Sequence, residues 1–276
     1  MKPSRFGARL RAGRLLNPAI HVALAATLAV GALATMPHAA AAASTSDVVA
    51  MLMGWLNTDR VANGLVPYRE WRALDDLATE RADNVAAAGI LSHDVAGGNV
   101  GDALDASGIP WEWYGEALGL SRLSLGEDAA RQVYDAWMAS APHHDILMSN
   151  VDNYVGIGIA QSSDGSTWFS LIATESPDHT APVAANVSLT RSGTTLTYRW
   201  TGHDVALQTN TAGLRSFNVV VQRDKGVWQY VRIGTTATSL SIGNRAHGHW
   251  YSFRVRAEDR RGTLSPWTPA IRIWVP

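Results

Sequence analysis

The sequence predicts an α+β protein whose two parts differ in the period of their apolar residues. From residue 46 to about residue 140, apolar side chains recur every three or four positions, which is the spacing of one face of an α-helix. After residue 182 they alternate with polar side chains, as in β-strands with one buried face. Residues 176–182 (Ser-Pro-Asp-His-Thr-Ala-Pro) lie between the two patterns and are typical of a linker.

The composition sets limits on the class of protein. At roughly 150 residues per domain, 276 residues predict two domains. A content of 46% hydrophobic and 17% charged residues excludes a disordered or fibrous chain. The absence of cysteine excludes disulfides, iron–sulfur clusters, thiolate nucleophiles and cysteine zinc sites. Beyond residue 43, 18 basic and 24 acidic residues give a formal charge of −6, which favours neither nucleic acid nor anionic lipid as a partner.

Residues 1–43 predict a secretory signal peptide. Five basic side chains precede the apolar stretch 19–35, and the alanine run 39–43 suits cleavage by a signal peptidase near Ala43. The apolar stretch has 17 residues, whereas a membrane-spanning helix needs about 20. We therefore expect a secreted, bacterial protein with no membrane span after cleavage.

The first part predicts three main helices and one hairpin. The helical stripes are Val49, Leu52, Met53 and Leu56; then Leu74, Leu77, Ala78, Ala82 and Val85; then Ala130, Val133 and Trp137. Ser124 and Glu127 predict a capping box at the start of the third helix, and Gly89 and Pro142 are stop signals. Residues 94–115 predict mostly loop with a short helix at 102–107. Residues 154–161 and 167–173 predict two strands joined by the turn 162–165.

The second part predicts an all-β sandwich of about 95 residues. Segments 196–200, 217–222 and 251–258 each alternate apolar and polar side chains. With five to seven such strands, the expected organisation is a first domain at 46–175, a linker at 176–182 and a second domain at 183–276.

Six segments of the first part resemble the bacterial branch of the CAP superfamily, which includes cysteine-rich secretory, antigen 5 and pathogenesis-related proteins. They are 56–60 (LNTDR), 64–67 (GLVP), 91–94 (LSHD), 115–117 (GEA), 137–140 (WMAS) with His143, and 155–158 (VGIG). Their order and spacing agree with that family. The resemblance implies a three-layer α-β-α sandwich with a central cleft.

The second part resembles a fibronectin type III domain, which has an immunoglobulin-like fold. Segment 251–259 (YSFRVRAED), followed by Gly262, Ser265 and Trp267, is similar to the end of such a domain, and Trp200 is similar to its core tryptophan. The resemblance implies a spacer or binding module. Arg254, Arg256, Arg260 and Arg261 give it a basic face, which would suit an anionic cell-wall polymer or another extracellular surface.

The CAP resemblance implies that His93, Glu116 and His143 line the cleft, and in some members of that family the two histidines bind a divalent metal. Neutral imidazoles suit zinc, and a nearby carboxylate can orient a water molecule or take its proton, so Glu116 is the candidate catalytic residue. Without the resemblance, His93 would be expected at a helix end, Glu116 at a strand edge, and His143 in the first turn of a short helix.

Three further residues are candidates for lining the cleft. Ser140 stands where eukaryotic members carry a second glutamate, so this cleft has one acid fewer. Trp111 and Tyr114 precede Glu116 and would form either a cleft wall or ordinary packing. No residues for an organic cofactor are predicted.

These observations favour a secreted binding protein whose cleft takes a small molecule, a peptide or a divalent metal. One alternative is a zinc-assisted extracellular hydrolase that uses His93, His143 and Glu116 on peptide or cell-wall bonds. A second alternative is an extracellular lipid or sterol carrier, since some relatives of the CAP fold bind such molecules.

Overall fold

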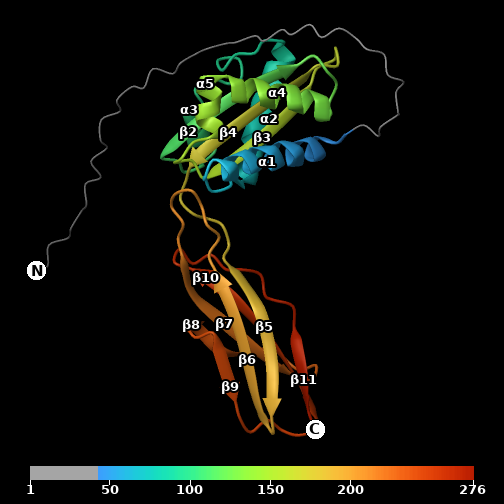
Figure 1. Ribbon diagram of the computed structural model, residues 1–276, viewed down its shortest axis with the longest axis vertical. Coiled ribbons are helices and arrows are strands. Elements are labelled where there is room, and N and C mark those ends of the chain that lie inside the picture. Colours follow the sequence, from blue (N-terminus) through green and yellow to red (C-terminus); the bar gives the residue numbers. More distant parts are fainter. Residues whose placement is uncertain (1–42) are drawn as a thin grey trace, which may run out of the picture.

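The computed structural model describes residues 43–276 (Figure 1). The predicted signal peptide lies outside the described residues, except for Ala43. One four-stranded sheet and five helices form from residues 45–175, and two further sheets form from residues 183–275. The α+β class predicted from the sequence is therefore confirmed.

The helices follow the predicted apolar stripes. They are α1 (Thr45–Ala62), α2 (Arg72–Ala88), α3 (Val100–Ala106), α4 (Glu127–Ala139) and α5 (Ala141–Leu147). All five predicted apolar residues of α2 are buried. The short helix expected at 102–107 is α3, and Pro142 lies in the first turn of α5, directly after α4 has ended.

The predicted capping box at the start of α4 is wrong. Gly126 is the N-cap of α4, and no side chain caps the helix there. Because Glu127 is already the first helical residue, Ser124 lies two residues too early to bond to the first turn. A capping box does form at α1, where the Ser44 hydroxyl accepts from the Asp47 amide at 3.2 Å and the Asp47 carboxylate accepts from the Ser44 amide at 3.1 Å.

The sheet of the first part has the strand order β1-β3-β4-β2, with β1 (Arg69–Glu70) parallel to β3 and the remaining pairs antiparallel. The predicted hairpin is β3 (Tyr154–Gln161) with β4 (Thr167–Glu175). Strand β2 (Trp113–Ser121) begins inside the segment expected to be mostly loop. Gly115 and Gly119 lower the strand propensity of β2, yet both are needed. A Cβ at Gly115 would lie 2.7 Å from the side chain of Ile146 in α5, and a Cβ at Gly119 would lie 2.3 Å from that of Val133 in α4.

Helices cover both faces of this sheet. Helices α1, α4 and α5 pack with strand residues such as Ile157 and Leu171, whereas α2 and α3 pack with Tyr154 and Ile172. Gly158 lets α2 lie directly on β3, since a Cβ there would be 2.1 Å from the Ala78 carbonyl carbon. The three-layer α-β-α sandwich is confirmed.

The second part is a sandwich of two antiparallel sheets. One has the order β11-β10-β7-β8, from β11 (Ile271–Val275), β10 (His249–Asp259), β7 (Leu214–Arg223) and β8 (Gln229–Thr235). The other has the order β5-β6-β9, from β5 (Val183–Ser192), β6 (Thr195–His203) and β9 (Ser239–Ile242). Trp200 is 2% exposed in the core between the sheets, as predicted.

The loop between β6 and β7, residues 204–213, contacts the first part of the chain (Figure 1). Leu207 is buried in the same apolar cluster as residues of α2 and α3. The Gln208 side chain accepts from the Val66 amide at 2.7 Å, and the Thr209 hydroxyl donates to the Val151 carbonyl at 2.7 Å. The two parts are therefore connected by packing and hydrogen bonds as well as by residues 176–182.

Candidate functional site at the edge of the central sheet

The predicted site residues gather around β2, which is an edge strand. Successive side chains of a strand point to opposite faces, so Gly115 and Glu116 face different helix layers. Glu116 contacts Arg81 of α2 on one face. On the other face, Ile146 of α5 lies against Gly115, close enough that a Cβ there would clash. This approach brings α5, which carries His143, to the same sheet edge as Glu116.

Glu116 is buried and fully engaged. Its Oε2 accepts from an Arg81 guanidinium nitrogen at 2.8 Å and contacts His93 Nδ1 at 2.5 Å, and its Oε1 accepts from Arg81 Nε. The side chains of Arg81 and Glu116 are 2% and 4% exposed. A buried carboxylate needs such partners because its desolvation is otherwise costly.

These partners also set the protonation state of Glu116. Burial alone would raise its pKa, but the hydrogen bonds and charges of Arg81 and His93 outweigh burial and lower the pKa below its ordinary value. A general base works best with a pKa near the working pH and with an oxygen that can reach the substrate. Glu116 meets neither condition, so its geometry suits the positioning of His93 better than catalysis.

His93 lies in the loop between α2 and α3, and this loop is tied to α2. Arg81 donates to the Gly98 carbonyl at 2.9 Å, and the Asn84 amide donates to the Ala96 carbonyl at 3.1 Å. With Nδ1 of His93 directed at Glu116, a metal or ligand of this ring would bind at Nε2. A carboxylate that holds the far nitrogen of a histidine in this way is the usual support for a metal-binding imidazole.

His143 lies on α5 and is half-buried. Burial lowers its pKa, and the charge of nearby His93 lowers it further. A lowered pKa keeps the ring neutral, as metal binding requires. The structure thus brings His93, Glu116 and His143 into one region. They do not form a group of three metal-ligating side chains; within residues 43–276 such a group is found elsewhere, at Asp178, Asp204 and Asp259.

The other predicted cleft residues are Ser140, at the start of α5, and the aromatic pair Trp111 and Tyr114. Ser140 is the N-cap residue of α5, where its carbonyl accepts from the His144 amide at 2.8 Å. Trp111 and Tyr114 pack edge to face with ring centroids 4.8 Å apart. Trp111 donates to Asp105 and Tyr114 to Asn99, each at 2.9 Å, so both aromatic residues hold α3 in place.

A surface depression of about 430 Å³ lies away from the histidines. It is lined by Asp83, Ala86, Ala87, Gln161, Ser162 and Ser163, none of which is a predicted site residue. The cleft expected around His93 and His143 stays a prediction.

Arg81 is the site residue that the sequence analysis missed. It lies four residues after Leu77 and four before Val85, inside the apolar stripe of α2, and it is 2% exposed. A charged residue on the buried face of a helix is rare unless it has a partner. That interruption of the stripe was the available signal, although the identity of the partner could not be read from it.

Of the four arginines predicted to form a basic face on the second part, Arg254 and Arg256 lie over tryptophan rings, whereas Arg260 and Arg261 lie in the turn after β10. The guanidinium carbon of Arg254 lies 4.8 Å from the ring centroid of Trp228, and that of Arg256 lies 4.6 Å from Trp267. Next to them Trp250 packs against Trp274, and both are about 40% exposed. This face therefore presents exposed aromatic rings together with the arginines.

No protein-family model matches the chain, and no curated protein matches its sequence. Three solved structures with related folds are an outer surface protein from Borrelia burgdorferi, an extracellular protein containing a SCP domain from Bacillus anthracis, and a Fn3-like protein from Clostridium thermocellum. The Borrelia protein is 16% identical over 49% of this chain and 96% of its own, with a TM-score of 0.44. The Bacillus protein is 15% identical over 48% and 44%, with a TM-score of 0.40. The Clostridium protein is 22% identical over 35% and 96%, with a TM-score of 0.27.

The chain spans less than half of the Bacillus protein. In residues 43–276, none of the helices combines the length and the apolar character that crossing a bilayer requires.

Proposed function

We propose that this protein is secreted and that it binds a divalent metal, or a ligand held through that metal, with His93 and His143 at the edge of its central sheet. The observation that carries the proposal is the engagement of Glu116 by Arg81 and His93. In this arrangement the Glu116 carboxylate orients the His93 imidazole. Because the same carboxylate is then not available as a general base, the arrangement favours binding over hydrolysis.

Zinc is the ion we expect, because two neutral imidazoles are suitable zinc donors and positions remain for water or a ligand. Glu116 would act as the residue that fixes the orientation of His93. Removing such a supporting carboxylate typically weakens metal binding by about 10- to 100-fold.

The proposed function also includes secretion of the protein and contact of its second part with an extracellular surface. The basic and apolar character of residues 1–43 supports secretion. The arginine–tryptophan face that includes Arg254, Arg256 and Trp250 would contact an extracellular surface such as a cell-wall polymer.

Zinc titration by calorimetry tests the metal site. We expect one zinc ion to bind, the double variant His93→Ala/His143→Ala to lose that binding, and Glu116→Gln to weaken it by about 10- to 100-fold. His203→Ala is the matched control, because His203 is exposed on β6 in the second part. Zinc binding by the double variant that equals the wild-type affinity would refute the proposal.

The two alternatives have separate tests. Zinc-dependent cleavage of a peptide and glycan panel that disappears in Glu116→Gln, with zinc still bound, would make the protein a hydrolase. Organic extraction of protein purified from its own culture medium tests the lipid carrier, and an extract without lipid counts against that alternative.

A further inference from the structure

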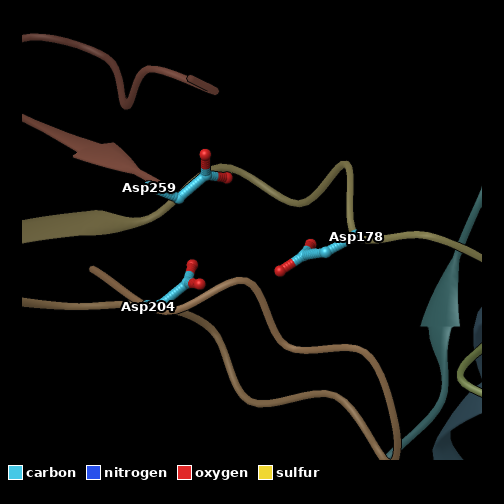
Figure 2. A group of neighbouring side chains, drawn as sticks. All are labelled: Asp178, Asp204 and Asp259. Atoms are coloured by element: carbon cyan, nitrogen blue, oxygen red, sulfur yellow. The ribbon is translucent and has the colours of Figure 1, made fainter. Parts of the chain in front are cut away.

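Three aspartates from distant parts of the chain meet where the two parts of the protein join. Asp178 belongs to residues 176–182, Asp204 follows β6, and Asp259 ends β10. Each contributes a carboxylate oxygen, and these oxygens all lie within 4.8 Å of one another. Figure 2 shows the three carboxylates turned toward a shared space.

Two of the three carboxylates are buried, and within residues 43–276 none of the three is neutralised by a direct ion pair. Asp178 is 2% exposed and Asp259 is 0% exposed. In the described part of the chain, none of the three is in an ion pair with an arginine, lysine or histidine side chain. Three carboxylates held this way repel one another at a cost that a bound cation would remove.

The hydrogen bonds of the cluster leave one oxygen without a partner. Asp178 accepts from the Ala212 amide at 2.8 Å, and Asp204 accepts from the amides of Val205 and Gly213. Asp259 Oδ1 accepts from two amides of its own turn, at 2.8 Å each. Asp259 Oδ2 is buried and has no hydrogen-bond partner among the described residues. A fully buried, unpartnered carboxylate oxygen beside two other carboxylates is an environment that a bound cation would stabilise.

We propose that Asp178, Asp204 and Asp259 bind a calcium ion that fastens the two parts of the protein together. Carboxylate oxygens are hard ligands, which suit calcium or magnesium rather than zinc. Calcium accepts six to eight oxygen ligands in flexible geometry, whereas magnesium demands a near-ideal octahedron and is seldom held by an all-protein cage, so calcium is the ion we expect. Backbone carbonyls or water would supply the remaining ligands.

The position of the cluster explains how calcium would act on the whole molecule. Asp178 also accepts from the hydroxyl of Tyr154 on β3, at 3.2 Å, so it is anchored to the first part. Asp204 and Asp259 belong to the second part. A cation shared by all three would hold the loop 204–213 against the first part, where Leu207 is buried.

Calcium titration of the EDTA-treated full-length protein tests this site. We expect one calcium ion to bind with a dissociation constant of about 10⁻⁴ to 10⁻³ M, the range of extracellular calcium modules, and magnesium to bind at least about tenfold more weakly. Calcium should raise the Tm by several degrees and slow amide hydrogen exchange at Ala212 and Gly213.

Two variants and two controls make the result specific. Asp259→Asn and Asp204→Asn should each weaken calcium binding at least about tenfold, and without calcium Asp259→Asn should have a Tm equal to or above that of the wild type. Asp204→Asn changes a half-buried position, so it remains informative if Asp259→Asn fails to fold. Asp164→Asn, in the exposed β3–β4 turn, and His93→Ala/His143→Ala should bind calcium normally.

Three results would overturn the proposal: no calcium binding up to about 10 mM, calcium binding unchanged in both aspartate variants, or magnesium binding as tight as that of calcium. Because the zinc site uses different residues, a failure here would leave the proposed function of His93 and His143 untouched.

Discussion

The buried pair of Arg81 and Glu116 allows a quantitative test of how the site is held together. Replacing Arg81 by methionine keeps most of the side-chain volume but leaves the Glu116 carboxylate, 4% exposed, with His93 alone. Removal of one partner of a buried ion pair typically costs about 3–5 kcal/mol. Arg72→Met on the same helix is the matched control. Arg72 Nε lies 3.8 Å from Asp76 Oδ2, and the two side chains are 91% and 71% exposed. The control should lower the free energy of unfolding by less than about 1 kcal/mol.

Hydrogen exchange measures this cost in the first part alone. The amides of the interior strand β4 (Thr167–Glu175) report its opening, whereas tryptophan fluorescence would mix both parts. At about 1.4 kcal/mol per tenfold change, protection of β4 should fall roughly 100- to 4,000-fold in Arg81→Met at pH 7. Without Arg81, burial raises the pKa of Glu116, so the charged form is penalised and the loss should shrink as the pH falls toward 4.

A double variant separates charge from packing. Adding Glu116→Leu to Arg81→Met removes the stranded carboxylate and should recover most of the lost protection. Equal losses in Arg81→Met and Arg72→Met, or no recovery in the double variant, would refute the interpretation of this pair as a buried, mutually dependent ion pair.

Other predictions concern packing and pH. Gly158→Ala places a Cβ 2.1 Å from the Ala78 backbone and should lower the free energy of unfolding by about 3 kcal/mol or more. Gly54 is exposed in α1 and a Cβ there has no neighbour within 4 Å, so Gly54→Ala should raise the free energy of unfolding by about 1 kcal/mol. Urea denaturation measures both changes. Burial raises the pKa of Asp75 to about 6. The contribution of Asp75 to stability is therefore complete below about pH 4 and is lost as the pH rises through 6. Asp75→Asn should remove this part of the pH dependence of the Tm. Leu207→Ala should cost about 2–4 kcal/mol in urea denaturation, because Leu207 is 4% exposed where the two parts meet.

Much of the fold was determined by local sequence. The stripe of α2, the β3–β4 hairpin and the burial of Trp200 follow from periods of 3.6 and 2 residues, which depend only on neighbours a few positions apart. The start of α4 was predicted wrongly because Gly126, rather than Ser124, is its N-cap. Strand β2 was partly missed because its glycines, which lower strand propensity, are required by helices that local sequence does not place.

The site depends on contacts between distant elements. His93 and Glu116, 23 residues apart, were singled out through the family resemblance, and the tertiary structure places them in direct contact. Arg81, 35 residues from Glu116, appeared in the sequence only as an ordinary charge in an apolar stripe. The aspartates at 178, 204 and 259 carry no common motif and meet only because the end of β10, the loop after β6 and the linker converge. The sequence by itself therefore determined the periods of the helices and strands, whereas only the packing of those elements decided which charged side chains share a buried space, because that depends on how whole elements approach one another.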